Sequence, residues 1–331
     1  MATAIDIHGH AMPLPVLTWL EGQGLADLSS FSDAIVRIDP TVSGVGPGAP
    51  LPLAPSMTDA GLRLDELDAL GLAAQAVSVP PFLMASTSTD PALVRSVAQR
   101  GNDALVDYCD ADRSRLLPLG FVPVGLPGAV DEAQRCLDEL GMPGLAIGSR
   151  GAGRDLDDAV NAELWAFLAE RRAFVFLHPS AVPEPARLAP FWFPQLVGYP
   201  METAIAAARL VFSGTVGDGR VALCLAHGGG CLPSLRGRLD MGWDRKPQAH
   251  TVEQLPSELF ASLYYDTAVF DTVALRRLVE DVGSSQVLLG TDHPFDLREL
   301  DPVGFVTAAN LTDADATAVL SGNARRLLNL A

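Results

Sequence analysis

Several features that would assign this chain to a familiar class are missing from its sequence. No run of about 18 apolar residues occurs, so we expect no membrane-spanning helix. The first residues contain no basic stretch followed by an apolar one, and we therefore expect no signal peptide. The four cysteines form no CxxC pair. This pattern is typical of reduced thiols in a cytoplasmic protein.

Positive charge is also scarce. Lys and Arg number 23 against 40 Asp and Glu, which gives a net charge of −17, and no basic run is present. Such a chain is poorly suited to bind a phosphate backbone or an anionic membrane surface. We therefore expect neither nucleic acid nor a membrane among its partners.

Apolar residues, by contrast, are abundant. Of the 331 residues, 48% are hydrophobic and 19% are charged, which allows a large core and excludes global disorder. The length fits two average domains, or a single α/β barrel with insertions.

Short apolar runs bounded by turn residues recur along the chain and alternate with helical patterns. Such runs are typical of parallel strands buried on both faces. The expected strands are residues 4–8, the run LAAQAVSV that contains 77–79, residues 116–122, 144–147, 173–177, 221–226 and 259–265, and an eighth with its core at 287–289. The expected helices are residues 58–71, 90–108, 131–140, 161–171, 202–212, 271–282 and 313–320.

This alternation predicts one domain over residues 1–331, an α/β fold of the distorted (β/α)8 TIM-barrel type. A doubly wound open sheet is the alternative, weakened because no GxGxxG follows the first strand. Residues 14–56 do not fit the alternation. Their last part, PTVSGVGPGAPLPLAP, holds five prolines and three glycines. We expect a small irregular insertion after strand 1.

The histidines follow the ends of the expected strands. His8 and His10 end the first strand, His178 and His227 follow two later ones, and Asp292 and His293 follow the last. In a barrel these strand ends converge on one face. Because residues i and i+2 of a strand share a face, both imidazoles of His8 and His10 can reach one ion. A further His and an Asp complete a catalytic site for a cation such as Zn²⁺.

Longer stretches carry a family resemblance. They are IDIHGHAMP, RLDELDALGLAAQAVS, LGMPGLAIG, FVFLHP, FPQLVGYPMETAIA, LAHGGGCLPSLRGRLDMG, LYYDTAVFD, VLLGTDHPF and SGNARRLLNL, in order along nearly the whole chain. The chain resembles the amidohydrolase superfamily, in the branch of 2-amino-3-carboxymuconate-6-semialdehyde decarboxylase and related nonoxidative decarboxylases. The resemblance implies a distorted barrel with an insertion after its first strand.

The same resemblance implies roles for individual residues. The metal ligands fall on His8, His10, His178 and Asp292, and the acid/base histidine falls on His227, so His227 and Asp292 are the catalytic candidates. Arg238 falls on an arginine that binds the substrate carboxylate from the neighbouring subunit, which implies a homodimer. The planar guanidinium of Arg238 suits a carboxylate.

Further pocket candidates come from loops that follow the strands. Arg150 lies after the fourth strand, where it can supply a second cation for the substrate. His293 follows the ligand Asp292 and is a candidate for substrate contact. Asp266 ends the seventh strand and either orients a pocket group or caps the next helix. The remaining candidates are the apolar residues Phe82, Met84, Trp192 and Phe295.

Together these features predict a metal-dependent nonoxidative decarboxylase, a carboxy-lyase acting on a small aromatic or unsaturated carboxylic acid. The alternative is a hydrolase or hydratase on the same scaffold, because fold and metal do not fix the reaction. The histidine-rich ligand set favours Zn²⁺ and leaves Mn²⁺ open.

Overall fold

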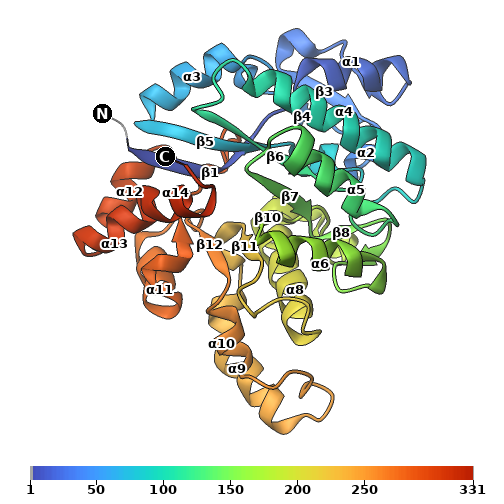
Figure 1. Ribbon diagram of the computed structural model, residues 1–331. Coiled ribbons are helices and arrows are strands. Elements are labelled where there is room, and N and C mark those ends of the chain that lie inside the picture. Colours follow the sequence, from blue (N-terminus) through green and yellow to red (C-terminus); the bar gives the residue numbers. More distant parts are fainter. Residues whose placement is uncertain (1–2, 331) are drawn as a thin grey trace.

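A computed structural model describes residues 3–330 and places eight parallel strands in one sheet (Figure 1). The order of neighbours in the sheet follows the chain, which confirms the predicted alternation. The strands are β1 (Ala4–His10), β5 (Leu72–Ser78), β6 (Leu116–Phe121), β7 (Gly144–Gly148), β10 (Phe174–His178), β11 (Ala222–Leu225), β12 (Tyr264–Asp266) and β13 (Val287–Leu288).

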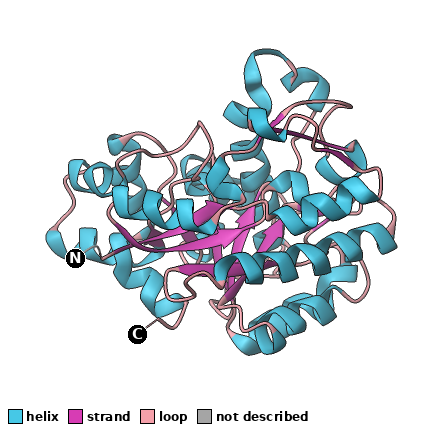
Figure 2. Ribbon diagram, turned by 90° about the horizontal axis from the view of Figure 1, so that it is seen from above, coloured by secondary structure: helices cyan, strands magenta, loops and turns pink. Residues whose placement is uncertain are grey.

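The barrel closes between β1 and the segment that follows β13. Ile7 N donates to the Leu289 carbonyl at 2.8 Å, Asp292 N to the His8 carbonyl at 3.0 Å, and His10 N to the His293 carbonyl at 2.8 Å. Figure 2 shows the strands at the centre and the helices around them. The predicted (β/α)8 barrel is confirmed.

Helices cover the outside of this barrel. Several begin where the sequence predicts, because an aspartate caps the first turn: Asp90 accepts from Ala92 N and Leu93 N, and Asp271 does the same for Val273 N and Ala274 N. The helices are α1 (Leu14–Gly22), α2 (Pro40–Ser43), α3 (Ala60–Ala69), α4 (Pro91–Cys109), α5 (Ala129–Gln134), α6 (Ala162–Arg171), α7 (Pro185–Leu188), α8 (Tyr199–Phe212), α9 (Leu232–Arg245), α10 (Pro256–Phe260), α11 (Thr272–Val282), α12 (Pro302–Ala308), α13 (Asp313–Thr317) and α14 (Asn323–Leu327).

The seventh strand is shorter than predicted. The sequence predicts it over residues 259–265, but Pro256–Phe260 is a helical turn and the strand covers only Tyr264–Asp266. Pro256 lies at the first position of that turn, where its fixed φ favours a helix. An apolar run this short does not distinguish a strand from a buried helix by itself.

The inserted segment is more ordered than predicted. After α1, three short strands pair as an antiparallel sheet: β2 (Ala26–Asp27), β3 (Ile35–Ile38) and β4 (Leu51–Pro52). Their apolar side chains form a small core with Phe82 and Met84 from the loop after β5. The insertion therefore packs as a layer of its own against one end of the barrel.

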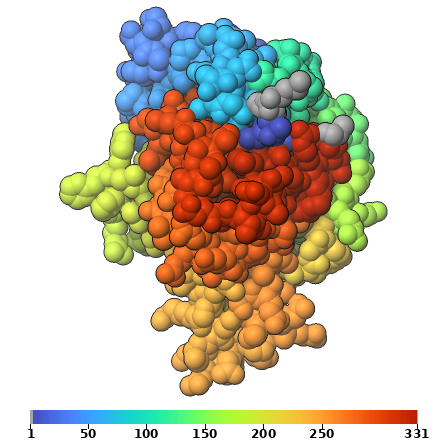
Figure 3. All heavy atoms as spheres, turned by 90° about the vertical axis from the view of Figure 1, so that its left-hand side faces the viewer, coloured from blue at the N-terminus to red at the C-terminus, as the bar shows by residue number. Residues whose placement is uncertain are grey.

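Two segments project from the barrel. The arm formed by α9 and α10 extends at the bottom of Figure 1 and forms the amber lobe of Figure 3. Figure 3 also shows a yellow-green lobe, the colour of residues near 190. Phe191 and Trp192 of that segment are exposed, as is Met241 of α9. Among the residues that the structure describes, no helix combines the length and the apolar character needed to cross a membrane.

A glycine near the end of β11 fixes the local path of the chain. Gly230 has a φ of +61°, and a Cβ atom there would collide with the carbonyl group of Pro200. We therefore expect Gly230→Ala to lower the free energy of unfolding by about 2–4 kcal/mol. Gly22→Ala, at an exposed helix end with open space around it, is the control and should raise it by up to about 1 kcal/mol. Urea unfolding of both variants measures the difference, and equal stability of the two would contradict this account of the turn.

Candidate metal centre

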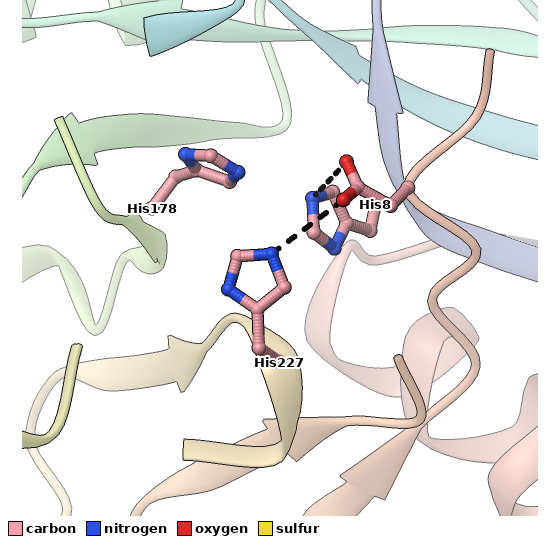
Figure 4. A group of neighbouring side chains, drawn as sticks. His8, His178 and His227 are labelled. Carbon is pink, nitrogen blue, oxygen red and sulfur yellow. Dashed lines mark ion pairs between the residues drawn. The ribbon is translucent and has the colours of Figure 1, made fainter. Parts of the chain in front are cut away.

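Five side chains converge at the carboxyl end of the barrel strands. His8 and His10 lie in β1, His178 is the last residue of β10, His227 follows β11 and Asp292 follows β13. Figure 4 shows the rings of His8, His178 and His227 around one space. The predicted convergence of histidines at one face is therefore present.

An irregularity in β1 directs both of its histidines to this centre. The pairing of β1 with β5 shifts between Asp6 and Gly9. Ile5 and Ile7 pack inside the barrel together with Phe176, and the His8 ring also lies against Phe176, with centroids 4.8 Å apart. The shift thus lets His8 face inward directly after an inward Ile7, and His10 follows it on the same side.

The donor atoms lie close together. His8 Nε2 is 3.1 Å from His10 Nε2. Asp292 Oδ1 is 3.1 Å from His8 Nε2 and 3.3 Å from His10 Nε2. One ligand atom from each of His8, His178, His227 and Asp292 lies within 4.8 Å of the other three.

These spacings fit one divalent ion. Ligand atoms about 2.1 Å from a common ion lie about 3.0–3.4 Å from one another in octahedral or tetrahedral geometry. Asp292 Oδ1 is buried and has no hydrogen-bond partner among the described residues. A buried carboxylate oxygen facing imidazole nitrogens is a costly arrangement unless a cation or proton lies between them.

A carboxylate behind His8 fixes the ring. Asp266 Oδ2 lies 2.6 Å from His8 Nδ1, so Nε2 is the atom directed at the centre. Asp266 Oδ1 accepts from Gly228 N at 2.8 Å and from Ala268 N at 3.2 Å. Of its two predicted alternatives, Asp266 therefore takes the orienting one, and it also holds the turn that carries His227.

The electrostatics favour a cation at the centre. Burial alone would raise the pKa of Asp292, but the charge of His8 and the facing ring nitrogens of His10 and His227 hold that pKa well below its usual range. Burial alone would lower the pKa of His8, yet the charge of Asp292 and the bond to Asp266 raise it to about 10. Burial lowers the pKa of His178 well below its usual range, with the neighbouring rings adding to the effect. Neutral imidazole is the form that binds metal.

His227 occupies the open side of the cluster. Its side chain is 12% exposed, and its Nε2 lies 3.5 Å from Asp292 Oδ2, whereas His8 and His10 pair with Oδ1. Its Nδ1 is buried without a hydrogen-bond partner among the described residues. His227 also has a φ of +56°, a strained conformation for a residue with a side chain, and the three glycines that follow it have positive φ as well.

The predicted apolar pocket residues separate into two groups. The Phe295 ring lies 5.3 Å from the His10 ring and 5.8 Å from the Phe82 ring, so this pair forms a wall beside the cluster. Met84 is fully buried in the core of the inserted segment, and Trp192 is 71% exposed on the surface. Within one chain, Met84 therefore packs in a core and Trp192 is exposed to solvent.

The predicted polar pocket residues lie at the edge of the centre or outside it. Arg150 pairs with Asp155 at 3.0 Å and is partly exposed. His293 Nε2 lies 3.1 Å from a carboxylate oxygen of Glu66 in α3. Arg238 is exposed on α9 and has no hydrogen-bond or ion-pair partner within residues 3–330. Contact of these three side chains with a substrate stays a prediction.

One neighbour of the cluster was missed from the sequence. The Tyr199 ring, at the start of α8, lies 6.3 Å from the His178 ring. Burial and the charge of Asp292 raise the pKa of Tyr199 to about 12, so its phenol is a neutral hydrogen-bond donor. Tyr199 belongs to the stretch FPQLVGYPMETAIA, but no spacing within that stretch marks it.

Comparisons with known proteins give separate evidence of the family to which the chain belongs. A family model described as Amidohydrolase matches residues 5–330. The chain is 32% identical over 277 residues to 2-amino-3-carboxymuconate-6-semialdehyde decarboxylase of Dictyostelium discoideum, covering 82% of this chain and 77% of that protein. It is 27% identical over 291 residues to gamma-resorcylate decarboxylase of Rhizobium sp. (strain MTP-10005), covering 81% and 86%.

A solved structure shares the fold. Dihydroxybenzoic acid decarboxylase from Polaromonas sp. JS666, crystallised with manganese and 2-nitroresorcinol, superposes with a TM-score of 0.77 at 22% identity, covering 100% of this chain and 98% of that one. The family match over almost the full length, together with the decarboxylase relatives and the His/Asp centre, leads to one conclusion. The chain belongs to the amidohydrolase family, in its branch of metal-dependent, nonoxidative decarboxylases.

Proposed function

We propose that His8, His10, His178 and Asp292 bind one divalent ion and that this centre decarboxylates a small aromatic or unsaturated carboxylic acid. The observation that carries the proposal is the spacing of the donor atoms, 3.1–3.3 Å between those of His8, His10 and Asp292. When bound, such an ion polarises a substrate oxygen as a Lewis acid. The nitrogen-rich donor set favours Zn²⁺, and the manganese in the Polaromonas structure makes Mn²⁺ the competing choice.

The two oxygens of Asp292 face different histidines. Oδ1 faces the nitrogens of His8 and His10, and Oδ2 faces His227 Nε2. Asp292 therefore belongs to the ligand set with one oxygen and holds His227 with the other. Because His227 is the more open ring, it is the group that meets the substrate.

His227 supplies the proton for the reaction. Imidazole gives and takes a proton near neutral pH. His227 donates a proton to the substrate carbon that carries the carboxylate, and a C–H bond forms there. The C–C bond to the carboxylate then breaks, CO₂ leaves, and the bonding pair restores the ring or double bond. Water returns the proton to His227.

Aromatic side chains beside two of the proposed ligands favour a flat substrate. Phe295 lies beside His10 and Phe82 packs against Phe295, while Tyr199 lies beside His178. Flat rings pack well against such groups, and the phenol of Tyr199 can donate to a carboxylate or hydroxyl oxygen. This arrangement supports an aromatic acid over an open-chain one.

A second copy of the chain completes the pocket in this proposal. Arg238 is exposed and without a partner in the described chain, on an arm that projects from the barrel (Figures 1 and 3). Exposed apolar side chains lie on this arm and on the other segment that projects from the barrel, among them Met241 of α9 and Trp192 of the segment near residue 190. In a homodimer, Arg238 reaches the partner's centre and binds the substrate carboxylate with its planar guanidinium.

Loss of one ligand should remove the ion. We expect His178→Ala to retain almost none of the Zn²⁺ or Mn²⁺ that the wild type binds at one ion per chain. His250→Ala, which removes an exposed ring stacked on Trp243, is the matched control and should retain the full amount. Elemental analysis after dialysis measures both. A full equivalent of ion retained by His8→Ala/His10→Ala would contradict the ligand assignment.

Loss of His227 should remove turnover and leave the ion. We expect His227→Asn to keep the metal while kcat for CO₂ release from a hydroxybenzoate-type acid falls about 100-fold or more. Metal content and CO₂ are measured on one sample. Wild-type turnover would refute the acid/base role, and loss of the ion would make His227 a ligand. Formation of a hydrolysed or hydrated product without CO₂ by the wild type would instead favour the hydrolase alternative.

Mixing two inactive variants tests the shared pocket. His178→Ala lacks the ion, and Arg238→Ala should bind substrate weakly. In a mixed dimer, the intact centre of the second chain receives Arg238 from the first. Random assembly at equal amounts should restore about one quarter of wild-type activity. A mixture that forms dimers but stays inactive, or a wild-type monomer that is fully active at nanomolar concentration, would contradict the proposal.

A further inference from the structure

Asp6 is a buried carboxylate that lies two residues before His8 in the chain and does not face the metal centre. Asp6 has no exposed surface, and both of its oxygens are fully used. Oδ1 accepts from His8 N at 2.9 Å and from Thr291 N at 3.0 Å. Oδ2 accepts from Gln75 Nε2 at 2.6 Å and from Thr291 Oγ1 at 2.6 Å. Asp6 thus ties β1 to β5 and to the segment after β13.

A buried arginine lies at the other end of this network. Arg63 of α3 has no exposed surface, and within residues 3–330 no carboxylate pairs with it. Its Nη1 donates to Gln75 Oε1 at 2.6 Å, and its Nη2 donates to the His10 carbonyl at 2.5 Å. The Gln75 side chain therefore stands between a buried cation and a buried anion, accepting from one and donating to the other.

The bonds of this network reach the backbone of the ligand-bearing segments. They hold the amide of His8, the carbonyl of His10 and the amide of Thr291, the residue before Asp292. The paired part of β13 is only two residues long, and the segment that carries Asp292 is tied to β1 both by the backbone hydrogen bonds that close the barrel and by this network. Burying two charged side chains costs free energy, and well-packed apolar residues in their place often give a fold of equal or greater stability. Stability alone therefore does not explain a buried arginine and a buried aspartate here.

We infer that the Arg63–Gln75–Asp6 network is a positioning device that sets the distance between the histidines of β1 and Asp292, and so the affinity of the centre for its ion. The inference rests on the proposed metal site. Arg63, Gln75 and Asp6 are positioning residues, because they touch the ligand-bearing backbone and not the donor atoms. Groups that orient ligands in this way typically change metal affinity by about 10–100-fold when altered.

The direction of each hydrogen bond makes the network testable. Arg63 donates, so Gln75 must present Oε1 to it and Nε2 to Asp6. In Asp6→Asn, the new NH₂ group opposes either Gln75 Nε2 or the two backbone amides, whichever way the amide turns. Adding Gln75→Glu removes this donor–donor clash, because the carboxylate introduced at position 75 accepts hydrogen bonds both from Arg63 and from the amide introduced at position 6. The double variant keeps one buried anion in the network and moves it one side chain away.

The experiment measures the Kd for Zn²⁺ by competition with a chromophoric chelator, alongside the melting temperature of each metal-free protein. We expect the Kd to rise at least about tenfold in Asp6→Asn and to return to within about threefold of wild type in Asp6→Asn/Gln75→Glu. Glu132→Gln is the matched control. Glu132 is also a buried acceptor, bonded to Asn102 Nδ2 at 2.7 Å on the outer layer of helices, so its loss should lower the melting temperature and leave the Kd unchanged.

Each outcome has a defined meaning. A folded Asp6→Asn with wild-type Zn²⁺ affinity would overturn the inference, as would a folded double variant that fails to recover it. If Asp6→Asn does not fold, Thr291→Val, which removes one donor to Asp6, is compared with Thr291→Ser, and equal affinity of the two would overturn it. Failure of the wild type to bind Zn²⁺ at all would instead contradict the proposed function.

Discussion

The contact between β1 and the segment after β13 is the constraint on which the centre depends. Asp292 N donates to the His8 carbonyl and His10 N to the His293 carbonyl, so the same hydrogen bonds that close the barrel bring together the first and the last of the proposed ligands. These ligands are 284 residues apart in the chain, from His8 to Asp292. No local segment contains the site, and its geometry is therefore a property of the closed barrel.

Charge then decides what such a centre can hold. Imidazole nitrogens and the Asp292 carboxylate converge in a space with little solvent. The negative charges of Asp292 and of Asp266, which contacts His8 from the other side of the ring, favour a cation there. Asp266 links the two halves of the chemistry, because one oxygen orients His8 and the other holds the turn of His227. In the proposed function, one buried side chain thus positions both a metal ligand, His8, and the acid/base histidine, His227.

Part of this could be predicted from the sequence because barrel topology carries most of the information. Once the strands alternate with helices, residues just after strand ends must meet, and this brings His8, His10, His178, His227 and Asp292 together. The family resemblance, and not the spacing, divides them into ligands and an acid/base residue.

The inserted segment was misjudged because its strands have two to four residues, too short for an alternation to be visible. Tyr199 and the partners of Asp6 were missed because their roles come from neighbours distant in sequence. Trp192 follows a strand in sequence, yet the loop turns it outward.

The central claim is that one ion is held by His8, His10, His178 and Asp292 while His227 stays outside its coordination shell. A crystal structure of the protein as purified with Zn²⁺, with anomalous scattering recorded at the zinc edge, tests it directly. The account predicts one anomalous peak within about 2.3 Å of donor atoms from those four residues, with His227 Nε2 more than about 3 Å away. A peak bound to His227 with His10 outside the shell, or no peak between these side chains, would contradict it.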